Sequence, residues 1–335
     1  MHRLGGDAQQ GAIMQRAMGQ PNRSHRRALT PLGLTLTAIL TLGAMTVAPT
    51  SSAVAGAFKT HRPVRAVVLG GSISMYYKGN YGEFLQHGCK NLEVINRAKV
   101  GAGGPALVKR LEQEILGNKA LMGELGAAKE RWMLFQGGLN SVWSPWLTNA
   151  TLANLFAKAN AGGLQTFALS LTPWGDERDG RFAGWKGVWT HRATQKVNKF
   201  LLGRATPDAA LGRYGKDHGH EWMKGELPNI AVDLWEIGLQ DSKATLRPTE
   251  PLSQTFARSR YKKEVEKKDA WVAEARAVPR HYLAKQYRDF DHIHPNSDGH
   301  RLMAVAACKK APASWGCDCG RIERAIFKGS VMDPK

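Results

Sequence analysis

This 335-residue chain carries a serine, a histidine and an aspartate of the types that acyl-transfer chemistry uses. Ser72 stands on a glycine-rich turn directly after the apolar run 64–69, and Asp291 precedes His294 by three residues near the other end of the chain. A histidine that removes the proton of a serine hydroxyl makes it a nucleophile, and an aspartate holds that imidazole in the required tautomer. Ser72, His294 and Asp291 are therefore candidate catalytic residues.

The elements that must position these residues follow from the pattern of apolar runs. Five short runs predict buried strands, at Val64–Leu69, Leu92–Ile95, Arg131–Gln136, Gln165–Leu171 and Ile230–Leu234. Helical spacing predicts helices at Pro105–Leu121, Leu152–Asn160, Trp189–Leu202, Asp298–Lys310 and, interrupted by Pro279, within Ser253–Tyr287. Strands that alternate with helices predict an α/β fold, a three-layer α/β/α sandwich around a central, mainly parallel five-stranded sheet. No Pro/Ser-rich linker divides residues 58–335, so we expect a single domain there.

Short polar or glycine-rich blocks follow the first three predicted strands. Ser72 comes after the first, Gly101 lies in a turn after the second, and Asn140 ends a Gly-Leu-Asn block after the third. Parallel sheets bind ligands beyond the carboxyl ends of their strands. We therefore expect these blocks, together with Asp291 and His294, to gather at one edge of the sheet.

These blocks, in this order along the chain, resemble those of the SGNH (GDSL-like) esterases. The resemblance spans the chain from Val64 to Ala307. The resemblance implies a flavodoxin-like sandwich and a serine ester hydrolase that needs no cofactor. It implies a catalytic triad of Ser72, His294 and Asp291. It also implies an oxyanion hole, whose donors would be the backbone N–H groups of Ser72 and Gly101 and the side-chain amide of Asn140.

Two positions depart from the pattern of that family. Gly71 stands where the family has an aspartate after the first glycine, and Ser141 follows Asn140 where the family often has an aspartate. These departures leave open a non-catalytic envelope-binding protein on the same fold. An O-acyltransferase also stays open, because the same acyl-enzyme can pass its acyl group to a sugar hydroxyl instead of water.

Two other patterns suggest different chemistry. Gly101, Gly103 and Ala106 match a dinucleotide-binding motif, but that motif requires a strand immediately before it and an acidic residue that closes a second strand. Histidine and acidic side chains that could ligate a metal are His292, His294, His300, Asp291 and Asp298 in one cluster and Asp217, His218, His220 and Glu221 in another. Neither cluster has the helical histidine spacing of the zinc hydrolases, so we expect no metal.

Aromatic residues follow the third and fourth predicted strands, where they should surround the site. Trp143, Trp146 and Trp174 are candidates to stack on sugar rings or to line an acyl pocket. Nearby cations that could meet an anionic substrate are Arg178, Arg181 and Lys186.

Residues 1–57 have the features of an export signal. The Arg26-Arg27 pair precedes a stretch without charge at 28–58, and the centre of that stretch, 32–47, is apolar. Small residues then end the segment, which predicts cleavage near Ala55–Ala57 and a periplasmic or extracellular protein. A retained membrane anchor is the alternative, and the arginine pair leaves Sec and twin-arginine export both open.

The charge and the cysteines agree with export. The formal net charge is +19, and about +15 remains once the predicted signal is removed, which favours an anionic partner. An exported protein rarely meets nucleic acid, so we expect an ester of a carbohydrate or a lipid as substrate and an association with an anionic envelope surface. The four cysteines form an even set, as in oxidising compartments. Cys317 and Cys319 should each bond elsewhere, and Cys89 is a candidate to tie the tail to the first half; the pairing stays open.

Overall fold

The computed structural model describes residues 58–176, 179–182, 185–216, 221–244, 268–328 and 331–334. The predicted export segment 1–57, Arg178 and three members of the second histidine cluster (Asp217, His218 and His220) lie outside these ranges. The expectations for them therefore stay predictions. No helix within the described ranges has the length and apolar character that a membrane span requires.

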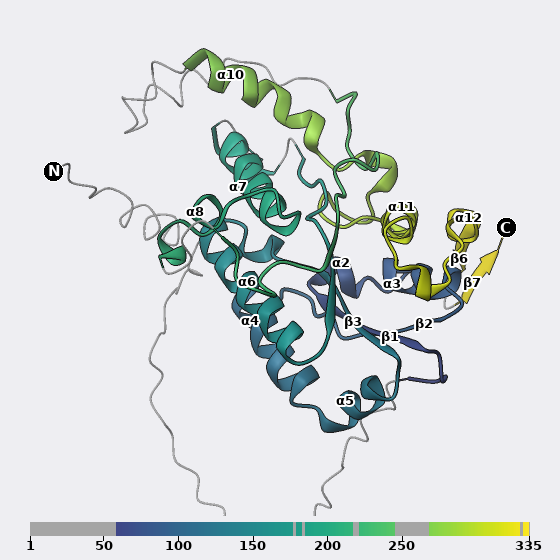
Figure 1. The fold of residues 1–335 in the computed structure, drawn as a ribbon. Helices are drawn as coiled ribbons and strands as arrows, with labels where there is room; N and C mark the ends of the chain where they lie inside the picture. Colours follow the sequence, from purple (N-terminus) through teal and green to yellow (C-terminus); the bar gives the residue numbers. More distant parts are fainter. Residues whose placement is uncertain are drawn as a thin grey trace, which may run out of the picture. The chain divides into compact units, whose positions relative to one another are not determined.

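A parallel five-stranded sheet forms the centre of the molecule, with the strand order β2-β1-β3-β4-β5 (Figure 1). The strands are β1 (Val64–Gly70), β2 (Leu92–Asn96), β3 (Glu130–Gln136), β4 (Gln165–Leu169) and β5 (Ile230–Val232). All four pairings are parallel; Val68 of β1, for example, lies opposite Asn96 of β2 and Leu134 of β3. The predicted α/β sandwich with a central five-stranded sheet is confirmed.

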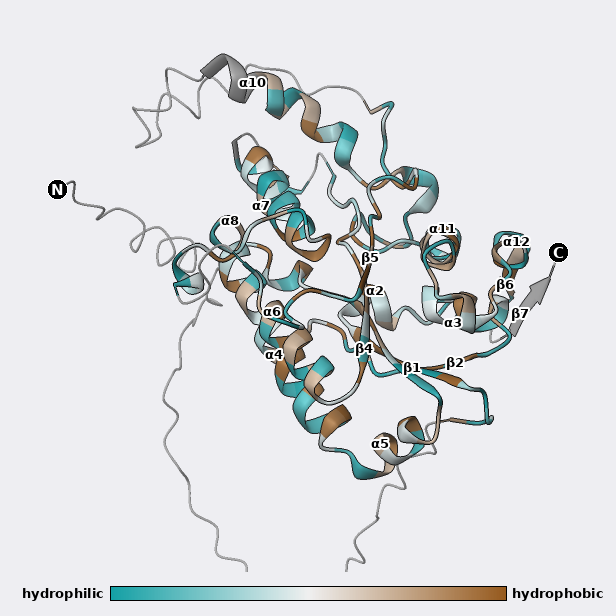
Figure 2. Ribbon diagram, viewed as in Figure 1, coloured by the Kyte–Doolittle hydropathy of each residue, from teal (hydrophilic) through white to brown (hydrophobic). Residues whose placement is uncertain are grey.

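Each face of the sheet carries its own hydrophobic core because successive strand residues point to opposite faces. Val67 and Leu69 belong to one core, which packs under α4, α6 and α7. Ala66 and Val68 belong to the other, which packs under α3, α11 and α12. Figure 1 shows these two sets of helices on opposite sides of the sheet, and in Figure 2 helices such as α4 and α6 carry both hydrophobic and hydrophilic turns, as expected for helices with one buried face.

The helices agree with the predicted segments in order but differ in their ends. The α-helices are α2 (Ser72–Met75), α3 (Tyr81–Gly88), α4 (Gly104–Arg110), α5 (Lys119–Gly126), α6 (Pro145–Ala161), α7 (Trp185–Leu201), α8 (Pro207–Leu211), α10 (Lys268–Ala277), α11 (Ser297–Cys308) and α12 (Cys319–Arg324). The segment predicted as one helix at 105–121 is broken. It passes from α4 into a π-helix at Leu111–Leu116 and ends there, and Asn118 caps the separate helix α5 by accepting the N–H of Leu121.

The carboxyl-terminal segment is joined to the rest of the molecule by two disulfides. Cys89 at the end of α3 bonds Cys317, and Cys308 at the end of α11 bonds Cys319. Cys89 thus ties the tail to the first half, and the two neighbouring cysteines bond elsewhere, as expected. An antiparallel hairpin of β6 (Ala325–Lys328) and β7 (Val331–Pro334), which no sequence pattern indicated, follows α12.

Candidate active site

Ser72 begins the single-turn helix α2, directly beyond the end of β1. The turn is tight, since a Cβ at Gly70 would lie 2.2 Å from the carbonyl oxygen of Gln136 and 2.3 Å from the hydroxyl of Ser74. Only glycine permits this approach. The Ser74 hydroxyl donates to the Gln136 carbonyl at 2.9 Å, so α2 is bonded to the end of β3. The half-buried Ser72 side chain is thereby fixed at the carboxyl edge of the sheet.

His294 and Asp291 lie on the loop that precedes α11. Nε2 of His294 is 2.8 Å from Oγ of Ser72, and Nδ1 of the same ring is 2.8 Å from Oδ2 of Asp291. Oδ1 of Asp291 accepts the backbone N–H groups of Ile293 at 2.7 Å and His294 at 2.8 Å. The loop ends at a fixed point, because the Asn296 side chain accepts the Gly299 N–H and caps α11.

The hydrogen bonds to Asp291 control its charge. Burial opposes its ionisation, but the bonds from the His294 ring and from the N–H groups of His294 and Ile293 outweigh burial and lower the pKa of Asp291 to about 2. The carboxylate is therefore ionised at neutral pH. It holds the Nδ1–H of His294 toward itself, which leaves Nε2 to accept the Ser72 hydroxyl proton.

The structure brings all three candidate oxyanion donors to the same edge of the sheet. The N–H of Ser72 belongs to the first residue of α2, where helix N–H groups have no partner within the helix and no side chain caps them. Asn140 is exposed in the turn after β3, and its amide nitrogen donates to the Ala102 carbonyl at 3.2 Å. Gly101 precedes Ala102 on the loop from β2 to α4, with φ +74° and open space on its Cβ side. Their role as an oxyanion hole stays a prediction.

The two departures from the family pattern have structural counterparts. A Cβ at Gly71 would lie 3.2 Å from the Asn140 amide nitrogen, so any side chain there would press on that amide. The Ser141 hydroxyl accepts the Gly104 N–H at 3.1 Å and donates to the Gly138 carbonyl at 3.2 Å. Ser141 thus joins the start of α4 to the turn that carries Asn140.

The three candidate tryptophans differ in burial. Trp174 is 3 % exposed, and its indole N–H donates to the Thr194 hydroxyl at 3.0 Å. It is a core residue, unlike the rim position that its place in the sequence suggested. Trp146 is half-buried with the Lys196 ammonium 3.7 Å from its ring centroid. Trp143, also half-buried, packs edge-on against Trp174 at 6.1 Å, so Trp143 and Trp146 stay candidates for substrate contact.

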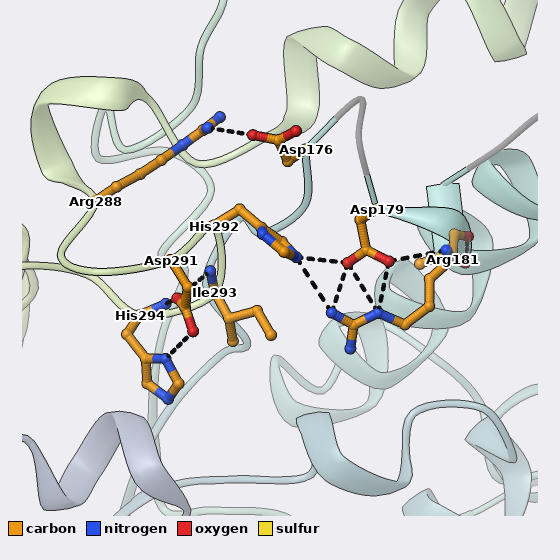
Figure 3. Close-up of polar contacts among 9 residues, drawn as sticks. Asp176, Asp179, Arg181, Arg288, Asp291, His292, Ile293 and His294 are labelled. Atoms are coloured by element: carbon orange, nitrogen blue, oxygen red, sulfur yellow. Dashed lines mark hydrogen bonds and ion pairs between the residues drawn. The ribbon is translucent and has the colours of Figure 1, made fainter. Parts of the chain in front are cut away.

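The loop after β4 is fastened to the segment that carries Asp291 (Figure 3). The N–H of Gly175 donates to the His292 carbonyl at 2.9 Å, and the buried Asp176 carboxylate accepts the Arg288 guanidinium at 2.9 Å. A third contact joins Nε2 of His292 to Oδ2 of Asp179 at 2.6 Å. We call these five residues the β4 clamp. No sequence pattern indicated it, because its two sides are more than a hundred positions apart.

Arg181 reinforces the clamp from the loop side. Its Nε donates to both carboxylate oxygens of Asp179 at 2.9 Å. Burial opposes the ionisation of Asp179, but the bonds from Arg181 and His292 outweigh it and lower the pKa of this carboxyl. His292, adjacent to Asp291, therefore points toward the ionised carboxylate of Asp179, as Figure 3 shows.

The three histidines of the first predicted cluster have separate surroundings. His292 faces Asp179, and His294 lies between Asp291 and Ser72. His300 is fully buried and stacks on Tyr76 at 4.7 Å, and neither of its ring nitrogens has a hydrogen-bond partner among the described residues. Burial, together with the neighbouring His294, lowers the pKa of His300 to about 3, so it is neutral. Within the described ranges, no three His, Cys, Asp or Glu side chains group as metal ligands would.

Fold and site together define an α/β protein with a hydrogen-bonded Ser–His–Asp array at the carboxyl edge of a parallel sheet. No family model and no curated protein matches the sequence. Several solved structures match. One is a GDSL-like lipase from Bacteroides thetaiotaomicron (14% identity, 74% of this chain and 87% of that one, TM-score 0.38). Others are an acetylxylan esterase from Geobacillus stearothermophilus (13%, 76% and 95%, TM-score 0.40) and a member of the lipolytic G-D-S-L family from Veillonella parvula (14%, 73% and 97%, TM-score 0.39). Similarity at this level does not indicate which reaction this chain catalyses, so its function is inferred from its own residues.

The lowered pKa of Asp291 predicts a pH-dependent contribution to stability. The ionised carboxylate stabilises the fold above the ordinary pKa of aspartate, about 4, and this contribution is lost as pH falls toward 2. The free-energy difference between the wild type and Asp291→Asn should therefore be largest at neutral pH and shrink on acidification. Urea unfolding of both proteins over a pH series measures it. A difference that stays constant with pH would contradict the assigned hydrogen bonds.

The β4 clamp predicts strong coupling between Asp179 and His292. A double-mutant cycle with alanine at both positions should give a coupling free energy of about 1–3 kcal/mol, because the carboxylate is buried and charged. The exposed pair Arg192 and Glu274, 2.5 Å apart, is the matched control and should give about 0.2–1 kcal/mol. Coupling no larger than that of the control pair would show that the clamp does not hold the loop.

Proposed function

We propose that the chain is an exported serine ester hydrolase, of carboxylesterase or deacetylase type, that cleaves an acyl ester on an envelope or extracellular carbohydrate or on a lipid. The observation that carries this proposal is the continuous array from Asp291 through His294 to Ser72, with 2.8 Å at each contact. Such an array gives a serine hydroxyl a base and gives that base a fixed tautomer.

In the acylation step, Oγ of Ser72 attacks the ester carbonyl carbon while Nε2 of His294 takes the hydroxyl proton. The ionised Asp291 stabilises the imidazolium that forms. His294 then returns this proton to the alcohol oxygen as the carbon–oxygen bond breaks, which leaves an acyl-enzyme and a free alcohol. In the second step His294 removes a proton from water, the water oxygen attacks the acyl carbon, and Ser72 leaves with the proton.

The negative oxygen of the tetrahedral intermediate needs donors that are already in place. The N–H of Ser72, at the start of α2, points out of the first turn of that helix. The other two donors in this proposal are the N–H of Gly101, on the loop after β2, and the amide of Asn140, in the turn after β3. The hydrogen bond from Asn140 to Ala102 supports this assignment, because it fixes the amide beside the Gly101 loop.

Two features support export. The two disulfides are of a kind that persists in oxidising compartments, and the basic charge of the chain suits an anionic envelope surface. The export signal, predicted for residues 1–57, remains part of the proposal.

Removal of the nucleophile tests the proposal directly. Ser72→Ala should lower kcat on p-nitrophenyl esters by about 10⁴-fold or more, and EDTA should leave the wild-type rate unchanged. The exposed serine Ser144, at the start of α6, supplies the matched control Ser144→Ala, which should keep full activity. A fluorophosphonate should label the wild type and the control but not Ser72→Ala. Activity that persists in Ser72→Ala would overturn the triad.

Removal of the amide donor tests the oxyanion hole. Asn140→Ala should lower kcat by about 10²–10³-fold with little change in KM, because the amide acts in the transition state. Asn91 offers a matched control, since its amide also donates to a backbone carbonyl, that of Ser314 at 2.8 Å, far from Ser72 in the fold. Asn91→Ala should leave kcat unchanged. Equal losses in both variants would point to a general structural effect instead.

A further inference from the structure

Exposed apolar side chains are concentrated around the proposed nucleophile. Seven large apolar side chains are exposed among the described residues, and four of them belong to segments that carry Ser72, Gly101 or Asp291. These four, which we call the apolar rim, are Met75 (44 % exposed), Tyr77 (70 %), Val100 (63 %) and Phe290 (72 %). Exposed apolar residues that gather in this way mark a contact surface, whereas isolated ones do not.

Each of the four residues lies close in the chain or in space to a proposed site residue. Met75 ends the helix that Ser72 begins, and Val100 directly precedes Gly101. The ring of Phe290 stacks on that of His294 with the centroids 5.0 Å apart. An ion pair of 3.4 Å between Lys78 and Asp289 joins the neighbour of Tyr77 to the neighbour of Phe290. The rim residues therefore lie on the segments that meet at the bond between Ser72 and His294.

A groove of about 750 Å³ adjoins the rim, a volume typical of small-molecule sites. Tyr77 belongs to both, and five of the nine residues that line the groove are aromatic or aliphatic, among them Tyr76, Ile326 and Phe327. Its one carboxylate, that of Asp298, is paired with Arg301 at 2.9 Å. More than half of the groove lining is therefore apolar, and its single carboxylate is paired with an arginine.

These features fit a lipid surface better than a hydrated polymer. Aliphatic and aromatic side chains gain free energy when they leave water for hydrocarbon, and tyrosine favours the boundary between lipid and water. Sugar rings stack on aromatic faces but contact aliphatic side chains such as Met75 and Val100 little. The net charge, about +15 once the predicted signal is removed, adds attraction to anionic lipid headgroups.

We propose that the apolar rim and the adjoining groove dock on the surface of an anionic lipid aggregate, and that the ester of a lipid enters the site from that surface. The groove receives apolar chain while the rim contacts the surface around Ser72. This inference rests on the proposed function for the reaction itself and adds the substrate class.

Fluorescent probes on the full chain test the docking. Tyr77→Cys and Val100→Cys each introduce one thiol beside the two native disulfides, to be labelled with a polarity-sensitive dye. Met223, exposed at 56 % and on a segment away from the rim, supplies the matched control Met223→Cys. Vesicles of phosphatidylcholine with phosphatidylglycerol should shift the dye emission to the blue at positions 77 and 100 but not at 223. Vesicles of phosphatidylcholine alone should cause a smaller shift.

An activity ratio tests the consequence for the substrate. Tyr77→Ser should lower the ratio of the rate on phosphatidylglycerol vesicles to the rate on soluble p-nitrophenyl acetate by roughly fivefold or more. Met223→Ser should change neither rate.

The outcomes separate this inference from the proposed function. Activity on the soluble ester without a dye shift at positions 77 and 100 would overturn the docking and leave the esterase standing. A shift of equal size at position 223, or a loss on an acetylated polysaccharide in Tyr77→Ser with no shift on vesicles, would also overturn it. Dye shifts at 77 and 100 in a chain inactive on every ester would support the docking surface and refute the proposed function.

Discussion

The hydrogen bond between the Ser72 hydroxyl and the His294 imidazole joins residues 222 positions apart, and much of the structure serves to hold its two ends. The sheet fixes the first end, because β1 pairs with β2 and β3 and Gly70 allows the turn to pack against Gln136. No strand fixes the second end. A loop carries His294, and a bond of 2.8 Å survives only if that loop is held as rigidly as the strand, since small displacements weaken hydrogen bonds steeply.

Two sets of contacts supply that rigidity. On one side the β4 clamp ties the loop to the segment after β4. Asp176 binds Arg288, and Asp179 binds His292 through a carboxylate whose hydrogen bonds outweigh its burial and lower its pKa. On the other side α11 begins at its Asn296 cap and packs in the same core as α3. The disulfides Cys89–Cys317 and Cys308–Cys319 then join this half of the core covalently. The position of His294 thus depends on packing that reaches across the whole face of the sheet.

Chemistry and recognition rely on different physical interactions in this site. The polar array depends on charge held in place, with Asp291 ionised and the buried His300 neutral behind it. The apolar rim depends instead on the free energy that apolar side chains gain when they leave water. A surface that removes water from the rim would also raise the strength of the hydrogen bonds within the site, because electrostatic interactions strengthen as the local dielectric falls. The docking and the hydrolysis that we propose would therefore support one another.

The amino-acid sequence by itself determined the α/β class, the strands and the edge at which Ser72, Asn140 and the Asp291–His294 pair gather, because these depend on local periodicity and on the geometry of parallel strands. Only the tertiary structure decided which loop residues are buried and which are exposed. The bond between Asp179 and His292 spans 113 positions, Trp174 packs in the core, and Tyr77 is open to solvent. Local spacing does not predict these contacts or exposures, because the burial of a loop side chain depends on which distant segment packs over it.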